Sequence, residues 1–262
     1  MRPNSNNIKY IRYTSVKEYL EHPSYVFIIN TLFIIAITLL LMAKQAAAPG
    51  TCYICDEPIT KRTAVTHLKK KHAEQGDDER YAIMVDTPYS SPYWMVLLVK
   101  PGATLEDLDS SLRDIWVECC GHLSAFTIDG TEYQSSSESG MNDDFGDAKS
   151  MKVKIEKVLC PGMAFLYEYD FGTTTVLRLK VADTITWQTE KDKIVMAGKN
   201  NQPEIPCTKC GEPASYHYLE NDDETVLCVD CSSDEDLDDC YLLSICNSPR
   251  TGQCGYEGGK YD

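Results

Sequence analysis

The spacing of eight cysteine and histidine residues constrains the fold of this 262-residue chain more than any other feature. The first group is a Cys-x2-Cys pair followed by a His-x4-His pair, and it consists of Cys52, Cys55, His67 and His72. The second group is two Cys-x2-Cys pairs separated by 17 residues, and it consists of Cys207, Cys210, Cys228 and Cys231. A tight turn can present two such ligands to one ion, and Zn²⁺ takes four ligands in a tetrahedron. The sequence therefore predicts two structural Zn²⁺ sites, one Cys₂His₂ and one Cys₄.

Both ligand sets are complete, which limits the chemistry expected of them. Four protein ligands leave no coordination position for water or substrate, so neither zinc is expected to be catalytic. Small zinc modules bury too little apolar surface to fold without metal, and zinc thiolates require a reducing compartment. We therefore expect the body of the protein in the cytoplasm. The other cysteines lie outside both ligand sets, and they are Cys119, Cys120, Cys160, Cys240, Cys246 and Cys254. For the run Cys119-Cys120-Gly121-His122, a thiol–imidazole pair and a partial metal site are alternatives to a structural role, which we favour.

A hydrophobic segment precedes the first ligand set. Residues 26–43 carry no charge over 18 positions, close to the minimum for a transmembrane helix. As a membrane anchor, this segment would leave the C-terminal body in the cytoplasm. A second interpretation is that translation starts at Met42, because Phe, Tyr, Met, Ile, Asn and Lys, whose codons are AT-rich, fill 20 of the first 41 positions but 54 of the remaining 221. Both interpretations stay open here.

The formal charge of −15 is unevenly distributed. Lys, Arg, Asp and Glu give +5 for residues 1–75, −9 for residues 76–200 and −11 for residues 201–262. A protein that binds nucleic acid over its whole surface is expected to be basic. Any nucleic-acid contact is therefore confined to the first zinc module, where the candidate contact residues are Lys61, Arg62, Lys69, Lys70 and Lys71.

The first ligand set predicts a zinc finger, with a hairpin turn at 52–55 and a helix capped by Thr60. The spacer between Cys55 and His67 is 11 residues, one fewer than DNA-reading fingers usually have. A single finger also buries too little surface for specific DNA recognition. Two roles stay open, contact with nucleic acid and a zinc-stabilised knob that has solvated lysines or holds a protein partner, and we favour the second.

The centre of the chain alternates strand patterns with one helix pattern. Residues 81–85 and 93–99 are rich in strand-forming residues between proline-containing turns, and residues 122–135 and 163–185 predict two hairpins. In the second hairpin, Asp170 is expected to cap the turn and Gly172 to be left-handed. Thr104 and Asp107 predict a capping box for a helix whose core-facing stripe is Leu105, Leu108, Leu112, Ile115, Trp116 and Cys119.

Four segments of this region resemble a known family. They are DIWVECCGHLSAFTIDG (114–130), an FGD triplet (145–147) in a polar loop, KVLCPG (157–162) and FLYEYDFGTTTVLRLKV (165–181). Their order is similar to that of the Ri-plasmid ORF-three-like family, also labelled insertion-element passenger or TnpR-like proteins, over roughly residues 80–200. The whole arrangement, in which a finger precedes this domain and a Cys₄ module ending in NSPRTGQCGY (247–256) follows it, is similar to bacterial and archaeal proteins. Most of those are hypothetical proteins. The resemblance implies an association with mobile elements but no established reaction.

Catalysis is weakly indicated by the residues. The TnpR label implies a resolvase, but the chain has seven arginines, two of them before Met42, and phosphoryl transfer needs concentrated positive charge or metal-bound carboxylates. An enzyme with a site near Asp170, His122 and Cys120 is an alternative, because a cysteine nucleophile needs a base held by a third group. Convergence of these side chains, with Glu168, in one cleft would favour it.

The second ligand set predicts a zinc ribbon over residues 205–231, with two strands between its knuckles. Cys240, Cys246 and Cys254 follow without a Cys-x2-Cys pair. We expect these three cysteines to bind no metal, with an incomplete site that includes His217 as the alternative.

Together these patterns predict an α+β protein, in which a mainly antiparallel sheet with one covering helix is flanked by two zinc-stabilised modules. The expected domains are an N-terminal segment (1–50), the finger (51–78), the α+β domain (79–200) and the ribbon with a C-terminal tail (201–262). The predicted function is a zinc-binding interaction protein with a nucleic-acid or protein partner. The alternatives are an enzyme and a single-pass membrane-anchored zinc protein, and a membrane is a partner only if segment 26–43 is translated.

Overall fold

The computed structural model describes residues 49–73, 78–88, 91–135, 148–188, 191–220, 223–233, 237 and 241–261. The chain divides into two units, Met1–Gln45 and Ala46–Asp262, and every described residue belongs to the second. Segment 26–43, Met42, the FGD triplet and Cys240 lie outside the described residues. None of the helices in the described ranges has the length and apolar character needed to span a bilayer.

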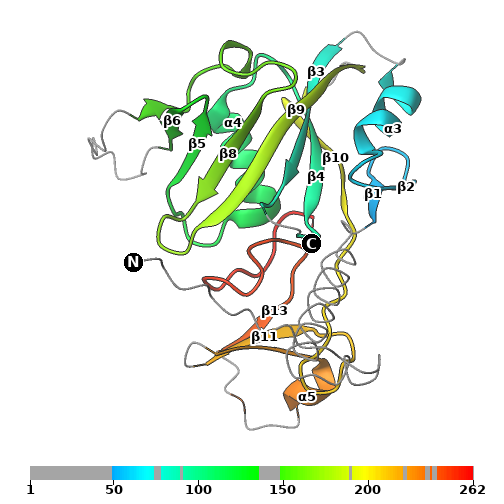
Figure 1. Cartoon of the computed structure of the whole chain (residues 1–262), viewed down its shortest axis with the longest axis vertical. Helices are drawn as coiled ribbons and strands as arrows, with labels where there is room; N and C mark the ends of the chain where they lie inside the picture. Colours follow the sequence, from blue (N-terminus) through cyan, green and yellow to red (C-terminus); the bar gives the residue numbers. More distant parts are fainter. Residues whose placement is uncertain are drawn as a thin grey trace, which may run out of the picture. The chain divides into compact units, whose positions relative to one another are not determined.

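A ten-stranded sheet organises the second unit (Figure 1). Its strand order is β2-β1-β10-β4-β3-β9-β8-β5-β6-β7, and of the pairs between these strands, the β6–β7 pair is parallel and the others are antiparallel. The protein therefore has the predicted α+β class. The strands are β1 (Gly50–Cys52), β2 (Pro58–Ile59), β3 (Asp78–Asp86), β4 (Trp94–Val99), β5 (Ser124–Ile128), β6 (Thr131–Gln134), β7 (Lys149–Ser150), β8 (Ala164–Tyr169), β9 (Thr175–Trp187) and β10 (Ile194–Asn200).

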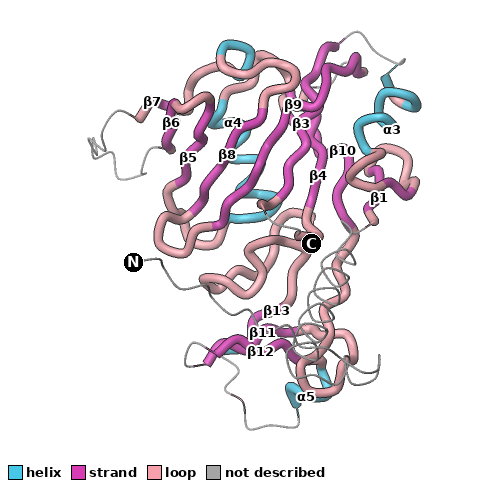
Figure 2. The backbone as a smooth tube through the Cα atoms, in the orientation of Figure 1, coloured by secondary structure: helices cyan, strands magenta, loops and turns pink. Residues whose placement is uncertain are grey.

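Helix α4 (Leu105–Leu112) covers one face of this sheet (Figure 2). The predicted capping box is confirmed: the Thr104 hydroxyl accepts from the backbone N–H of Asp107 at 3.1 Å, and the Asp107 carboxylate accepts from the Thr104 N–H at 2.8 Å. The helix continues as one π-helical turn, Arg113–Val117, which buries the rest of the predicted stripe. Cys119 is the exception, because it lies beyond the helix end and is only half-buried.

The finger packs against the opposite face of the sheet. Cys52, Ile59 and Leu68 form a second core with sheet residues that include Trp94 and Val96. Strand β4 is buried along all six residues because α4 lies on one of its faces and the finger lies on the other. Strand β1 also pairs with β10, so the two short finger strands extend the sheet at this edge.

Some local features differ from the sequence expectation. Helix α3 (Ala64–Lys71) begins at Ala64 with Thr63 at its N-cap, because the carbonyl of Thr60 accepts from the N–H groups of both residues at 2.9 Å in a preceding turn. In the turn after β8, the left-handed residue is Asp170 (φ 63°) and not Gly172, although the Asp170 carboxylate does cap the turn by accepting from the Gly172 N–H at 3.0 Å.

The C-terminal module is a separate three-stranded sheet of order β12-β11-β13. Strands β11 (Tyr216–Glu220) and β12 (Asp223–Leu227) form the predicted hairpin, helix α5 (Val229–Ser233) follows, and β13 (Leu242–Ser244) pairs with β11.

The tail, residues 245–261, returns from β13 to the main sheet. The side-chain amide of Asn200 donates to the side-chain oxygen of Asn247 at 2.6 Å, and the side-chain amide of Asn247 donates to the backbone carbonyl of Asn200 at 2.8 Å. The indole N–H of Trp116 donates to the carbonyl of Asn247 at 3.0 Å, and the Ser248 hydroxyl donates to the carbonyl of Trp116 at 2.6 Å. The tail therefore links the C-terminal module to the π-helical turn and to β10.

Candidate metal centres

The first predicted ligand set converges at the base of the finger. The four ligand atoms of Cys52, Cys55, His67 and His72 lie within 4.8 Å of one another. The Cys52 Sγ to His72 Nε2 distance is 3.7 Å, and Cys55 Sγ to His67 Nε2 is 3.4 Å. A thiolate sulfur and an imidazole nitrogen on a tetrahedral Zn²⁺ lie about 3.6 Å apart, since the Zn–S bond is about 2.3 Å and the Zn–N bond about 2.0–2.1 Å. The spacing therefore fits a zinc ion.

Local structure explains how these ligands meet. The cysteine pair lies on a turn that is closed by a hydrogen bond from the N–H of Asp56 to the carbonyl of Cys52 at 2.8 Å, with Asp56 at φ 58°. His67 lies within α3, and His72 is the residue just beyond its last turn. The carboxylate of Glu57 lies 4.0 Å from Nδ1 of His67, on the side where a ligating histidine usually has a carboxylate partner.

The second predicted ligand set also converges. The ligand atoms of Cys207, Cys210, Cys228 and Cys231 lie within 4.8 Å of one another, and Cys210 Sγ to Cys228 Sγ is 3.6 Å. The first pair again lies on a turn whose next residue, Gly211, has a positive φ of 82°. The second pair is presented by the start of helix α5.

A third cluster lies outside the two predicted ligand sets. Cys119, Cys120, His122 and Cys254 also have their ligand atoms within 4.8 Å of one another. Cys254 is expected from the sequence to bind no metal, because it belongs to no Cys-x2-Cys pair, and it is 132 residues from His122. The described residues thus contain three groups of four ligands that can hold a metal ion, where the sequence predicted two.

The residues of the enzyme alternative do lie together, but their geometry does not suit a catalytic triad. Cys120 Sγ lies 2.9 Å from His122 Nε2, and an Asp170 carboxylate oxygen lies 3.5 Å from the same nitrogen. A triad places its carboxylate on the other ring nitrogen, where it orients the base. Glu168, which lies on β8, makes no hydrogen bond or ion pair with these side chains in the described part of the chain.

Asp170 is instead held by a buried arginine. An Arg250 guanidinium nitrogen lies 2.6 Å from the Asp170 carboxylate, and Arg250 is fully buried. Burial raises the pKa of Asp170, but the hydrogen bonds from Arg250 and from backbone N–H groups outweigh it and hold the pKa below its usual range. The same guanidinium donates to the Thr173 carbonyl at 2.8 Å and to the Cys119 thiol at 3.4 Å. Asp170 and Arg250 therefore form a structural ion pair beside the third cluster.

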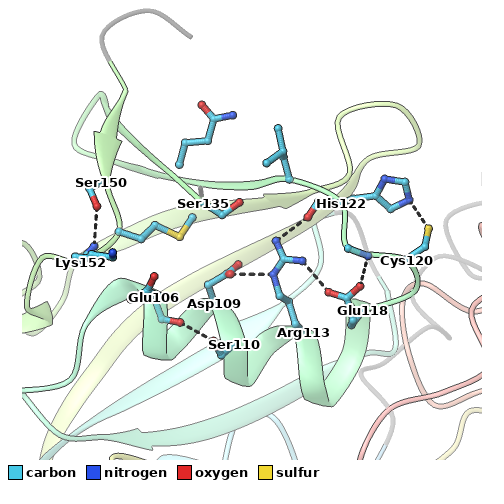
Figure 3. A pocket seen from close by; sticks show the side chains of 14 residues that line it. Glu106, Asp109, Ser110, Arg113, Glu118, Cys120, His122, Ser135, Ser150 and Lys152 are labelled. Carbon is cyan, nitrogen blue, oxygen red and sulfur yellow. Dashed lines mark hydrogen bonds and ion pairs between the residues drawn. The ribbon is translucent and has the colours of Figure 1, made fainter. Parts of the chain in front are cut away.

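A polar cavity of about 810 Å³ lies between α4, the corner that leads into β5, and the ends of β6 and β7 (Figure 3). Its central residue is Arg113, which donates to the carboxylates of Asp109 and Glu118 at 2.8 and 2.7 Å and to the carbonyl of His122 at 2.7 Å. Burial lowers the pKa of Arg113, but the negative charge of Asp109 and the contact with Glu118 raise it well above its usual value. Because its donors are directed to protein acceptors, Arg113 supports the cavity wall and is not free to bind an anion.

Three of the five candidate nucleic-acid contacts on the finger are in ion pairs within the chain. Lys61 pairs with Asp86 at 2.5 Å, Lys69 with Asp183 at 2.6 Å, and Lys71 with Glu57. The other two, Arg62 and Lys70, are exposed. The structure thus places much of the finger's positive charge against acids of the same chain.

The fold and these clusters define a protein with an α+β sheet that carries Cys/His groups able to hold metal. The sequence model of the family described as plasmid pRiA4b ORF-3-like protein matches residues 82–224, more than half of the chain, and the protein belongs to this family. The match confirms the predicted plasmid ORF-three-like domain. No curated protein matches the chain. Among solved structures it is similar to MM3350, a protein of unknown function from Methanosarcina mazei Go1, at 19% identity and a TM-score of 0.39, covering 45% of this chain and 68% of that one.

Proposed function

We propose that the protein is a non-enzymatic zinc-binding protein in which structural zinc ions hold the finger and the ribbon in shape, and that the assembled surface binds a protein partner. The observation that carries the proposal is the completeness of the two predicted clusters, each of which brings four ligand atoms within 4.8 Å of one another.

Complete clusters support a structural role for the metal. Catalytic zinc sites keep one position for water or substrate, whereas Cys₄ and Cys₂His₂ sets fill the tetrahedron with protein ligands. The buried positions of Cys52, Cys207 and Cys228 also support this role, because a buried thiolate is shielded from substrate. Zinc then contributes to folding of the modules and not to a reaction.

Charge supports a protein partner over a nucleic acid. The chain carries a formal charge of −15, and Lys61, Lys69 and Lys71 are already paired with acids. Displacing those acids would offset the gain from phosphate contacts.

Exposed apolar side chains beside the first cluster also support a protein partner. Tyr53 and Ile54 at the tip of the cysteine turn are 39% and 38% exposed, and the ring of Tyr261 lies 6.0 Å from that of Tyr53. Aromatic residues that are exposed close together are typical of protein contact surfaces. The proposal also includes an association with mobile elements and the TnpR-like label, both of which rest on the family resemblance.

Cobalt substitution and nucleic-acid binding together test this proposal. Full-length protein loaded with Co²⁺ is expected to show the intense visible bands of tetrahedral thiolate sites, unchanged by azide or other small ligands because no position is open. In a salt-titrated assay with DNA and RNA, wild type and Lys69→Ala/Lys70→Ala/Lys71→Ala are expected to bind equally weakly. Bands that shift with azide would contradict structural zinc, and tight binding that the variant loses would favour a nucleic-acid partner.

A cysteine-dependent enzyme is the second candidate, favoured by the 2.9 Å contact between Cys120 and His122. An activated thiolate would react with iodoacetamide faster than an ordinary exposed cysteine such as Cys160 at neutral pH. Equal or slower modification of Cys120 would remove this candidate.

The membrane-anchored alternative depends on segment 26–43, and cytoplasmic localisation is likewise a proposal. The intact mass of the natively expressed protein distinguishes a chain that begins at Met1 from one that begins at Met42. Only a chain that begins at Met1 contains segment 26–43.

A further inference from the structure

We propose that Cys119, Cys120, His122 and Cys254 form a third zinc site that clamps the C-terminal tail onto the corner between α4 and β5. The first three ligands follow the π-helical turn within four positions of one another, and the fourth comes from the tail. The site uses none of the residues of the other two clusters.

Three of the distances match those of the two predicted clusters, and the fourth, from Cys120 Sγ to His122 Nε2, is shorter at 2.9 Å. Cys120 Sγ lies 3.6 Å from Cys119 Sγ and 3.7 Å from Cys254 Sγ, and His122 Nε2 lies 3.4 Å from Cys254 Sγ. The first two values are close to the roughly 3.8 Å between thiolates of a zinc tetrahedron. They also equal, within 0.1 Å, the 3.6 Å between Cys210 and Cys228 in the ribbon.

Backbone conformation also supports a ligand site. The first cysteine turn of each predicted cluster is followed by a residue with positive φ, Asp56 (58°) in the finger and Gly211 (82°) in the ribbon. The residue after Cys120 is Gly121 at φ 76°. In the tail, Cys254 itself has φ 48°, which is uncommon for a residue with a side chain and requires support from its surroundings. A bond from its sulfur to a metal would provide that support.

The charges around the cluster suit a metal with three thiolates. Three thiolates and one neutral imidazole give a Zn²⁺ site a net charge of about −1. Arg250, fully buried, supplies positive charge by donating to Cys119 Sγ at 3.4 Å. Its partner Asp170 keeps the guanidinium in place. Soft thiolates with one imidazole favour Zn²⁺ over Mg²⁺ or Ca²⁺, which take oxygen ligands.

The third site is consistent with the other contacts of the tail. The NSPRTGQCGY segment provides Asn247 and Ser248, which bond to the main sheet and the π-helical turn, Arg250, which pairs with Asp170, and Cys254, which completes the cluster. A zinc ion would lock the end of this segment to the chain 132 residues earlier. Fixing the tail would also fix the C-terminal module, because the last strand of that module, β13, directly precedes the tail.

Zinc stoichiometry tests the proposal directly. Full-length protein purified without chelators is expected to contain three zinc ions per chain by inductively coupled plasma mass spectrometry, and Cys254→Ser is expected to contain two. Cys160→Ser is the matched control, because Cys160 is an exposed free cysteine outside all three clusters, and it is expected to retain three. Cys52→Ser and Cys207→Ser report the predicted sites separately, so loss of zinc there tests the proposed function and not the third site.

A measurement on unmodified protein covers the case in which Cys254→Ser misfolds. Cadmium-113 NMR of the Cd²⁺-substituted wild type is expected to give three resonances, with one at a shift between those of the Cys₄ and Cys₂His₂ ions because the shift moves with the number of thiolate ligands. Two resonances, or a wild-type content of two zinc ions that Cys254→Ser does not change, would overturn the third site.

Discussion

Gly50, at the start of the finger, lies in close contact with the indole ring of Trp94 in β4. A Cβ atom on Gly50 would lie 2.5 Å from Cζ2 of that ring and would also collide with the carbonyl oxygen of Lys199. The finger can pair with β10 in this register only because the residue at the contact has no side chain. The position of the finger on the sheet is therefore encoded in the residue that precedes its first ligand turn.

Replacing this glycine is expected to loosen the finger. Gly50→Ala should lower the free energy of unfolding by about 1–3 kcal/mol, because Trp94 and the β1–β10 pair must shift to admit the methyl group. Gly102→Ala is the control, since nothing lies within 4 Å of its Cβ position and its φ is ordinary. Urea denaturation of both variants measures the difference, and an equal effect of the two substitutions would show that the close contact is not present.

Loss of the first zinc ion is expected to expose the core that the finger covers. Cys52→Ser should remove one zinc per chain and destabilise the protein by more than about 3 kcal/mol, because the metal and the apolar contacts of Ile59 and Leu68 are lost together. Dye binding and denaturation measure the effect. Cys160→Ser should leave both unchanged, and a stable, zinc-replete Cys52→Ser protein would argue against metal ligation by Cys52.

The capping box of α4 is expected to make stability depend on acid pH. Burial raises the pKa of Asp107, but hydrogen bonds from Lys193 and Thr104 outweigh it, so the pKa lies below its ordinary value of 3.8. A carboxyl group with a depressed folded-state pKa stabilises the protein fully above its unfolded pKa and loses that contribution as the pH falls through the folded pKa.

The difference in unfolding free energy between wild type and Asp107→Asn should therefore be constant, at about 1 kcal/mol, from neutral pH to about pH 4. Below that pH it should shrink. Comparing the two proteins at each pH cancels the loss of zinc that acid causes in both. A difference that grows as the pH falls would show that Asp107 is not ion-paired in the folded state.

The buried ion pair behind the third cluster is expected to be sensitive to removal of one partner. Asp170→Ala should destabilise the protein by about 3–5 kcal/mol, because it leaves the charge of Arg250 buried without a carboxylate. The exposed pair of Lys154 and Glu156 is the comparison, and Glu156→Gln should change stability by less than about 1 kcal/mol. Similar effects of Asp170→Ala and Glu156→Gln would indicate that water reaches Arg250.

Local patterns predicted much of the sheet and its helix. The capping box of Thr104 and Asp107 depends on residues three apart, and the turn between β5 and β6 depends on two adjacent residues, Asp129 and Gly130, which have φ angles of 46° and 73° as a two-residue hairpin requires. The ligand sets of the finger and ribbon were also visible because short spacings bring each pair together. These features are determined by neighbours in the sequence.

Features that depend on distant residues were missed. Strand β10 contains a glycine and a lysine. Gly198 is favoured because a Cβ there would lie 2.9 Å from the backbone oxygen of Thr51 and 2.8 Å from Cδ1 of Ile59, both in the finger, and no local pattern reveals this contact. The third cluster joins Cys254 to three residues more than a hundred positions earlier, so no short ligand spacing in the sequence indicates that Cys254 belongs to it. The only local indication was the adjacency of two cysteines and a histidine in Cys119-Cys120-Gly121-His122.

The most direct test of the account is the near-ultraviolet circular dichroism of full-length protein before and after zinc is removed with a strong chelator. Trp94 and Trp187 lie in the core that the finger covers, and the ring of His72 meets that of Trp187 edge-on at 6.1 Å. If zinc holds the finger in place, the tryptophan signal is lost on chelation and returns when Zn²⁺ is added. A metal-free protein with an unchanged signal and unchanged resistance to urea would show that metal ions do not hold this structure together.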